Sequence, residues 1–206
     1  MVTKLKNKTS PRLILTDIDG VCLDWEYAFD VYLQTHGFQK IPGGELKYDI
    51  GKRYGIDPDQ GKKLIKIFNE SAAIGFLPPL RDAMYYIKRL HEEHGYVFHA
   101  ITSLSADENA QELRRMNLNK LFGKTAFVEF TMLDTGADKD EALAPFKDSG
   151  LWWIEDKIQN CKVGLDLGLK PLLVEHGHNM DFDHAEIPRV KNWKEIYQIV
   201  CNQSLK

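Results

Sequence analysis

Residues 13–25 read LILTDIDGVCLDW, and this stretch carries most of the information about the fold. A mostly apolar run leads into Asp17 and Asp19, and Gly20 follows directly. The run is typical of a buried strand, and alternate residues of an extended chain point to the same side. Two carboxylates held close together cost free energy unless a cation or a reaction stabilises them. Gly20 allows a sharp turn with the backbone close to a ligand, so the stretch predicts a strand that ends in a functional site.

The chain beyond this stretch alternates short apolar runs with longer amphipathic ones. The runs RLILTD, YVFHAIT, AFVEF, LWWIED and PLLVEH are typical of strands buried on both faces. Residues 106–118, 138–146 and 158–167 have helical spacing. This alternation predicts an α/β, doubly wound, Rossmann-like fold, in which helices cover both faces of a parallel sheet.

The first two predicted strands are about eighty residues apart, far more than one crossover helix needs. We therefore expect a small helical cap at residues 24–78, inserted between these strands and lying over the functional edge of the sheet. The prolines of LPPLRDA then begin a new helix that runs to about His94. Residues 1–23 and 79–206 are expected to form the catalytic core.

Polar residues gather where the predicted strands end. Besides Asp17 and Asp19, they are Thr102, Ser103, Glu155, Asp156, Glu175 and His176. In parallel sheets ligands bind beyond the carboxyl ends of the strands, so the sequence predicts one site built from several strand ends.

Composition and charge narrow the function classes. A net charge of -3 gives no broad electrostatic reason to bind nucleic acid, although a local basic patch stays open. No apolar run approaches the length needed to span a bilayer. The first ten residues are basic without a following apolar run, so we expect a frayed leader and no secretory signal.

The three cysteines, Cys22, Cys161 and Cys201, lie far apart and share no metal-type spacing. An odd number without a secretory signal favours free thiols in a reducing compartment, so a cytoplasmic location is expected. Cys22 has no histidine near it in sequence, which favours a packing role over a nucleophile.

Four segments together resemble the motifs of the haloacid dehalogenase superfamily, the aspartate-nucleophile phosphatases. LILTDIDGV resembles the first motif, and HAITSLS resembles the second, a strand that ends in Thr or Ser. Lys139 in GADKDEAL fits the third motif, and LWWIEDKIQN fits the fourth. All four occur in the expected order between about Leu13 and Asn160.

The resemblance implies roles for the four acids. Asp17 would be the nucleophile and a Mg²⁺ ligand, forming an aspartyl-phosphate. Asp19 would protonate the leaving alkoxide and then activate water, and its backbone carbonyl would be a further Mg²⁺ ligand. Asp156 would complete the Mg²⁺ site, with Glu155 a ligand through water or a hydrogen-bond acceptor behind the ligands. The alternative is that Asp17 and Asp19 only cap a helix, which would leave an uncompensated acidic cluster.

Three further residues would hold the phosphoryl oxygens, according to the same resemblance. They are the Thr102 hydroxyl, the Ser103 backbone amide and the Lys139 ammonium. Thr102 and Ser103 have the alternative of a helix cap, and Lys139 that of a solvated lysine, because Lys124 and Lys147 lie nearby in sequence.

The residues after the first motif suggest a substrate class. DIDGVCLDWEYAF resembles the opening of the 5'(3')-deoxyribonucleotidases, and the wider sequence is similar to small phosphatases of phages and bacteria. In the deoxyribonucleotidases the corresponding aromatic residue packs near the nucleobase, which implies that Trp25 stacks on a base. The alternative is a core tryptophan that fastens the cap helix.

We therefore expect a Mg²⁺-dependent phosphomonoesterase that acts on a small phosphorylated substrate, a nucleoside monophosphate first of all. The alternatives are a phosphatase for sugar phosphates or for nucleic-acid 3'-phosphate ends, and a phosphate-accepting module without turnover. The segment HGHNMDFDH at residues 176–184 has zinc-ligand residue types, but its spacing favours a loop at the rim of the site.

Overall fold

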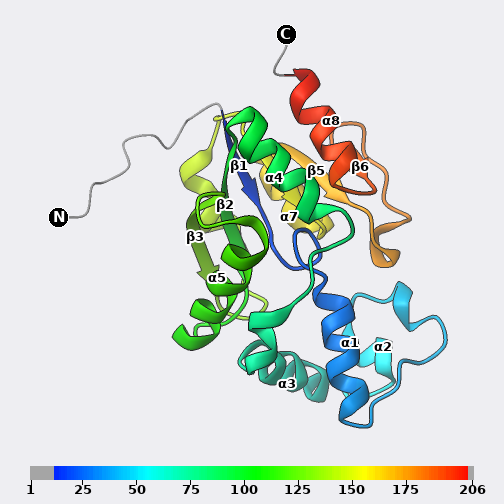
Figure 1. Cartoon of the computed structure of the whole chain (residues 1–206). Helices are drawn as coiled ribbons and strands as arrows, with labels where there is room; N and C mark the ends of the chain where they lie inside the picture. Colours follow the sequence, from blue (N-terminus) through cyan, green and yellow to red (C-terminus); the bar gives the residue numbers. More distant parts are fainter. Residues whose placement is uncertain (1–11, 204–206) are drawn as a thin grey trace.

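The structure of the chain is a computed structural model, and it describes residues 12–203 (Figure 1). The leader expected at the first ten residues lies outside the described residues. No helix of the described part is long and apolar enough to cross a membrane.

A six-stranded parallel sheet forms the centre of the molecule (Figure 1). Its strands are β1 (Leu13–Thr16), β2 (Val97–Ser103), β3 (Phe127–Leu133), β4 (Trp152–Glu155), β5 (Lys170–Val174) and β6 (Arg189–Val190). Their order is β3-β2-β1-β4-β5-β6. The chain therefore adds strands on one side of β1 as far as β3, and then on the other side from β4 to β6. This order confirms the doubly wound parallel fold, and its reversal point, where ligands bind in such sheets, lies between β1 and β4.

Successive side chains of β1 point to opposite faces of the sheet and enter different cores. Ile14 belongs to the cluster that contains Ile87 and Ile196, whereas Leu15 belongs to the cluster that contains Leu143. Because both faces of β1 are covered, the strand reads as a continuous apolar run.

Helices of the core cover both faces of the sheet (Figure 1). One face carries α4 (Ala83–His94), α5 (Glu108–Phe122) and α8 (Trp193–Gln203). The other carries α6 (Asp140–Leu143), the short η3 (Ala144–Phe146) and α7 (Ile158–Asp166). The predicted helical segments lie within a few residues of these bounds.

Strand β3 differs from the expectation that every strand is buried on both faces. Of its seven residues only Phe127 is buried. The physical reason is its place at the edge of the sheet, which leaves Glu129 and its neighbours open to solvent. The two-residue strand β6 at the other edge was not predicted, because so short a strand gives no periodic signal.

A group of helices lies between β1 and α4, beyond the carboxyl end of β1 (Figure 1). It comprises α1 (Trp25–Thr35), η1 (Gly44–Leu46), α2 (Ile50–Tyr54), α3 (Pro58–Asn69) and η2 (Ala72–Phe76). Asp24, Asp49 and Asp57 start α1, α2 and α3, because each side chain accepts a hydrogen bond from a backbone amide in the first turn. These helices fall inside residues 24–78, and their role as a cap stays a prediction.

The two chain segments that connect these helices to the core run side by side. Asp24 N–H donates to the Pro78 carbonyl at 2.9 Å, and Leu80 N–H donates to the Cys22 carbonyl at 2.9 Å. Cys22 is fully buried in this connection, which agrees with a packing role.

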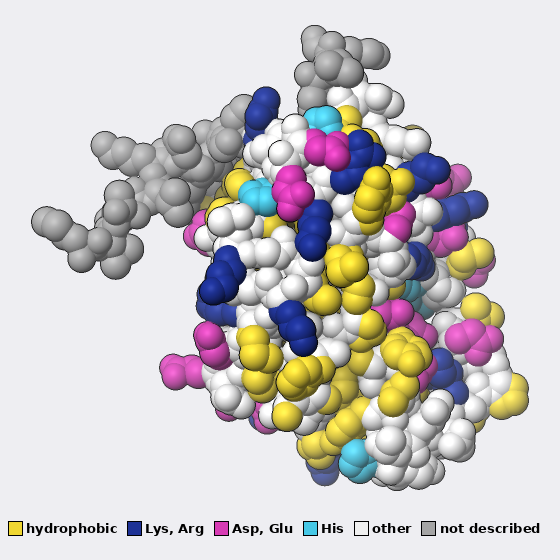
Figure 2. Space-filling view, in the orientation of Figure 1, with side chains coloured by type: hydrophobic (Ala, Val, Ile, Leu, Met, Phe, Trp, Pro, Cys, Tyr) yellow, Lys and Arg dark blue, Asp and Glu magenta, His cyan; other side chains and the backbone are white. Residues whose placement is uncertain are grey.

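Charged side chains are mixed on the face drawn in Figure 2, where Lys and Arg lie among Asp and Glu. That face shows no continuous basic stripe of the kind that nucleic-acid backbones bind.

Candidate active site

The turn after β1 places Asp17 and Asp19 at the edge of the sheet. Asp17 N–H donates to the Ile154 carbonyl of β4 at 2.8 Å, and the Asp17 carboxylate accepts from Ile18 N–H at 2.7 Å. Gly20 has a φ of 74°, and a Cβ at this position would lie 2.6 Å from Asp156 Oδ2. Glycine is therefore required both by the backbone and by the close approach of Asp156.

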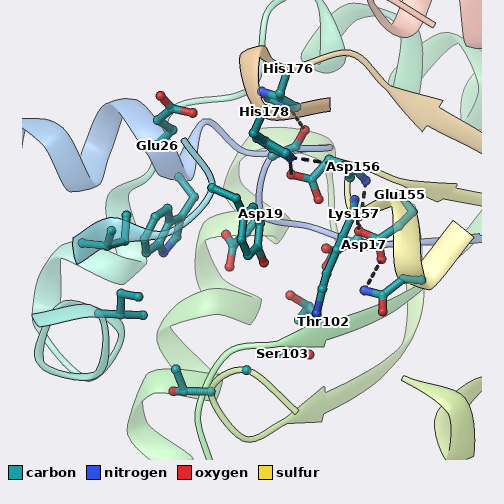
Figure 3. Close-up of a pocket in the computed structure, with 18 of the residues that line it drawn as sticks. Asp17, Asp19, Glu26, Thr102, Ser103, Glu155, Asp156, Lys157, His176 and His178 are labelled. Carbon is teal, nitrogen blue, oxygen red and sulfur yellow. Dashed lines mark hydrogen bonds and ion pairs between the residues drawn. The ribbon is translucent and has the colours of Figure 1, made fainter. Parts of the chain in front are cut away.

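Three carboxylates meet at this point because β1 and β4 are parallel neighbours. Asp17, Glu155 and Asp156 each offer an oxygen, and these oxygens lie within 4.8 Å of one another. Figure 3 shows the acids converging from the ends of the two strands.

Lys139 stands just before α6 and reaches into the acidic group. Its Nζ lies 2.8 Å from Asp17 Oδ2 and 2.8 Å from Glu155 Oε2, and its side chain is 2% exposed. Burial lowers the pKa of Lys139, but the charges of Asp17 and Glu155 outweigh burial and raise the pKa above its usual value. The lysine is therefore charged at neutral pH.

Glu155 is completely buried, and its oxygens are already occupied by donors. Oε1 accepts from the backbone amides of Asp156 and Lys157, and Oε2 accepts from Lys139 and from Asn160 Nδ2. This arrangement favours the prediction that Glu155 is an acceptor behind the ligands.

The acids of the cluster repel one another in a buried place. Burial, more than any charge, raises the pKa of Asp17 to about 6 and that of Asp156 to about 7. The charge of Asp17 raises the pKa of Asp156 further. Such shifts mark a place where a cation would lower the free energy.

Asp19 has a partner that the sequence did not reveal. Arg114 of α5 is fully buried, and its Nη1 lies 2.6 Å from Asp19 Oδ1. Burial raises the pKa of Asp19, and the charge of Arg114 opposes this rise. In the sequence Arg114 stands 95 positions away in an amphipathic helix, and nothing there distinguishes it from Arg115.

Thr102 and Ser103 end β2 beside the acids (Figure 3). The buried Thr102 hydroxyl has no hydrogen-bond partner within residues 12–203. Ser103 Oγ donates to the Ala137 carbonyl at 2.8 Å, so its hydroxyl fastens the loop before Lys139. An unpartnered buried hydroxyl costs free energy, which suggests that a ligand completes Thr102.

The acids line a cavity of about 320 Å³, which is shared between the ends of the strands and the helical group. All eight residues to which the sequence analysis gave a role, including Trp25, line it, whereas the predicted strand-end residue Glu175 does not and instead lies 3.8 Å from Arg189. Further lining residues, which sequence reasoning did not assign, include Glu26, Tyr48, Asp49, Ile50, Arg53, Ile65, Asn69 and Lys157, while His176 and His178 come from the loop predicted at the rim.

Trp25 fits both of the interpretations that its sequence position allowed. Its ring stacks on Phe29 at a centroid distance of 4.5 Å and meets Phe68 edge-on at 5.6 Å. Its Nε1 donates to Asn69 Oδ1 at 2.9 Å, and Asn69 Nδ2 in turn donates to the Leu104 carbonyl. The tryptophan therefore fastens α1 and also forms part of the cavity wall.

The loop after β5 reaches the rim of the cavity through two parallel histidine rings. His176 Nε2 donates to the Gly20 carbonyl at 2.6 Å, and the His178 ring meets the Tyr48 ring at 5.1 Å. Burial lowers the pKa of both histidines, that of His178 to about 4. Among residues 12–203, the side chains grouped closely enough to hold a metal are Asp17, Glu155 and Asp156, so the loop of residues 176–184 forms no zinc-type group.

Comparison with known proteins identifies one sequence relative. The chain is 30% identical over 190 residues to an uncharacterised 32.4 kDa protein of Enterobacteria phage T4, from the Gp30–rIII intergenic region. The match covers 89% of this chain and 67% of the phage protein. No model of a protein family matches the chain.

Solved structures resemble the fold at low sequence identity. A haloacid dehalogenase-like hydrolase from Streptococcus pneumoniae has a TM-score of 0.60 and 14% identity, covering 91% of this chain and 97% of its own. CbbY from Rhodobacter sphaeroides, solved with phosphate, has a TM-score of 0.56 and 15% identity, covering 90% and 96%. An L-2-haloacid dehalogenase from Xanthobacter autotrophicus also has this fold, with a TM-score of 0.58 and 11% identity, covering 92% and 98%.

Proposed function

Because the chain belongs to one family with the phage T4 protein and has the haloacid dehalogenase fold, we propose that it is a Mg²⁺-dependent phosphomonoester hydrolase. One observation carries the proposal: the carboxylates of Asp17, Glu155 and Asp156 meet around Lys139 at the end of β1, with Asp19 two residues after Asp17. A nucleophile, a cation site and an acid–base group are the three parts that this reaction needs.

The donor set suits Mg²⁺, which prefers oxygen ligands and binds through one or two carboxylates. The raised pKa values of Asp17 and Asp156 support this choice, because a cation would offset the cost of their buried charges. Their side chains and the Asp19 carbonyl would hold the metal. When bound, Mg²⁺ would neutralise the repulsion between an anionic nucleophile and an anionic phosphate ester.

The residues of the chain then divide the reaction into two displacements. In the first, an Asp17 carboxylate oxygen forms a bond to phosphorus, and the bond from phosphorus to the leaving oxygen breaks. Asp19 gives its proton to that oxygen, so an alcohol departs and an aspartyl-phosphate remains. In the second, Asp19 takes a proton from water, which attacks phosphorus, and inorganic phosphate leaves Asp17.

The phosphoryl oxygens need donors while charge moves onto them. The Thr102 hydroxyl, which has no partner among the described residues, would supply one, and the Ser103 backbone amide would supply another. The Lys139 ammonium, already 2.8 Å from Asp17, would supply the third and hold the nucleophile in place.

A nucleoside 5'-monophosphate is the substrate class we propose first. The helical group of residues 24–78 would act as the cap that excludes water and contacts the leaving group. Trp25 supports this choice, because Phe29 and Asn69 fix its ring in the cavity wall, where a base can stack. A cavity of about 320 Å³ suits a substrate of this size.

A sugar phosphate is the second candidate. It is supported by the likeness to CbbY, which has been solved with phosphate and, as a point mutant, with xylulose-(1,5)bisphosphate. Hydroxyl-rich substrates would use the polar residues Glu26, Asp49 and Arg53 of the cavity lining.

The test is a turnover assay of the purified chain with Mg²⁺ against nucleoside monophosphates, sugar phosphates and p-nitrophenyl phosphate. We expect multiple turnovers, and a loss of at least about 10³-fold on Asp17→Asn, since the nucleophile is then removed. Asp59→Asn, an exposed aspartate of α3, is the matched control and should keep the wild-type rate. Halide release from L-2-chloropropionate without phosphatase activity, or an Asp17→Asn variant as fast as the wild type, would contradict the proposal.

A further inference from the structure

Helix α5 carries a completely buried arginine whose charge meets the candidate acid–base residue. The Arg114 side chain is 0% exposed, and its Nη1 lies 2.6 Å from Asp19 Oδ1. Its Nε and Nη2 have no hydrogen-bond partner within the part of the chain described by the structure. A guanidinium that is fully desolvated and only partly satisfied costs free energy, so stability alone is a poor reason for this arginine.

The contact divides the two oxygens of Asp19 between two tasks. Asp19 lines the cavity and its side chain is 20% exposed, whereas Arg114 is sealed behind it. Arg114 occupies Oδ1, which leaves Oδ2 for a proton on its way to or from the substrate. Since Arg114 does not reach the cavity, it would act on the reaction only through Asp19.

The backbone around Asp19 is fixed separately from its side chain. Gly20 N–H donates to the Leu23 carbonyl at 2.9 Å, and Asp19 and Leu23 form a bridge. These bonds fix the turn but leave the carboxylate free to rotate about its side-chain bonds. The Arg114 contact removes that freedom.

From these observations we propose that Arg114 is a positioning residue, which fixes the Asp19 carboxylate in the orientation needed for proton transfer; this rests on the proposed phosphatase function. One turn along α5, Asn117 Nδ2 donates to the Leu77 carbonyl, in the segment that returns from the helical group. The same helix therefore places the acid–base residue and holds the second connection to the proposed cap.

The proposal distinguishes substrates by their leaving groups. An alkoxide leaves only if it receives a proton, so an alkyl phosphate needs a correctly oriented Asp19 in the first displacement. A p-nitrophenolate ion leaves without a proton. Hydrolysis of the aspartyl-phosphate needs Asp19 as a base with either substrate.

The experiment compares kcat/KM for p-nitrophenyl phosphate with kcat/KM for the faster of thymidine 5'-monophosphate and glycerol 2-phosphate. In Arg114→Met, we expect the alkyl value to fall by about 100-fold, the lower end of what general acid catalysis contributes. The p-nitrophenyl value should change by less than about threefold, because kcat/KM reports only steps up to release of the leaving group. A burst of p-nitrophenolate, about one per enzyme, should precede a slower steady state, because the intermediate then accumulates.

Three further variants make the result specific. Arg115→Met, the neighbour on α5, should leave both values unchanged. Arg114→Lys keeps the charge without the planar fork and should show the same selective loss in weaker form. Asp19→Asn/Arg114→Met should be no slower on the alkyl ester than Asp19→Asn alone, because the two residues act as a unit.

Equal losses on both substrates in Arg114→Met, or additive losses in the double variant, would overturn the positioning role. If Arg114→Met does not fold, the comparison of the two substrates is made instead in Arg114→Lys and in Asp19→Asn/Arg114→Met, and it decides whether Arg114 positions Asp19. A wild-type chain without phosphatase activity would instead contradict the proposed function, so the two failures are distinguishable.

Discussion

Asp17 and Asp19 are two residues apart, yet their surroundings differ in the way their proposed tasks require. Asp17 contacts Lys139, which holds an anionic nucleophile, whereas Asp19 contacts Arg114 through only one of its oxygens. Burial raises the pKa of both aspartates. Neighbouring carboxylates in different environments are a general means of assigning two roles to one residue type.

Asp156 should destabilise the metal-free protein at alkaline pH. Burial raises its pKa in the folded state to about 7, from an ordinary 3.8. The unfolded chain therefore loses this proton at a lower pH than the folded chain does, so stability falls as the pH rises from about 4 to about 7 and levels off above that. In EDTA, Asp156→Asn should be more stable than wild type by about 4 kcal/mol at pH 8, since each pKa unit corresponds to about 1.4 kcal/mol.

This advantage should shrink as the pH is lowered toward 5, where the folded wild type holds the proton. Urea unfolding at several pH values measures it. If Asp156→Asn is less stable than the wild type at pH 8, or if its stability advantage grows toward pH 5, the buried charge of Asp156 does not destabilise the metal-free protein.

Trp25 is expected to select substrates that carry a base. Trp25→Ala removes the stacking surface, which is worth about 1–3 kcal/mol per base, so KM for thymidine 5'-monophosphate should rise at least about fivefold. KM for glycerol 2-phosphate should change little. Trp25→Phe is the control that keeps an aromatic face but loses the hydrogen bond to Asn69. Equal changes in KM for the two substrates would mean that Trp25 only packs within the helical group and does not contact the base.

At the scale of elements, the buried side-chain amide of Asn69 links the helical group to the core. Asn69, at the end of α3, accepts from Trp25 Nε1 of α1 and donates to the Leu104 carbonyl after β2. Thr102 and Ser103 end that same strand. Movement of α3 would therefore shift both the aromatic wall of the cavity and the end of β2, where phosphate binding is proposed.

Asn69→Leu should lower the free energy of unfolding by about 2–3 kcal/mol, because the buried Trp25 N–H and Leu104 carbonyl are left without partners. Chemical denaturation measures this loss. Asn119→Leu, at a partly exposed position of α5, is the control and should cost much less. A neutral Asn69→Leu variant would mean that water replaces both bonds.

The elements that the sequence predicted well are those with long or strongly patterned signals. The central strand β1 and the helix α7 were both placed within a residue, because one is a continuous apolar run and the other has helical spacing over its whole length. The short α2 and β6 have too few residues to show a period. The exposure of β3 depends on its place at the sheet edge, which the local sequence does not contain.

At the scale of the whole molecule, the site could be predicted as far as the strand ends could be recognised. Asp17, Thr102 and Asp156 were foreseeable, since parallel strands present their carboxyl ends at one edge. Arg114 and Tyr48 were not, because a helix face and an irregular loop reach the site only through tertiary packing. The site residues that the sequence could not predict are thus those that long-range contacts bring to the site.

Mg²⁺ should stabilise the whole protein through the same acids. A cation that binds only the folded state raises the free energy of unfolding by about 2.7 kcal/mol at about one hundred times its dissociation constant. We therefore expect the melting temperature to rise with Mg²⁺ and to return on EDTA addition. The rise should be largely lost in Asp156→Asn and retained in Asp59→Asn. An equal rise in Asp156→Asn would place the cation elsewhere.

The central claim is that Asp17 forms a bond to phosphorus, and chemical trapping tests it most directly. The protein is mixed with p-nitrophenyl phosphate and Mg²⁺ and quenched with borohydride, which reduces an acyl phosphate to the alcohol, and peptides are then read by mass spectrometry. The account predicts substrate-dependent homoserine at position 17, enriched in Arg114→Met, where the intermediate accumulates. Turnover with no homoserine at position 17, or with the label at another acid, would contradict it.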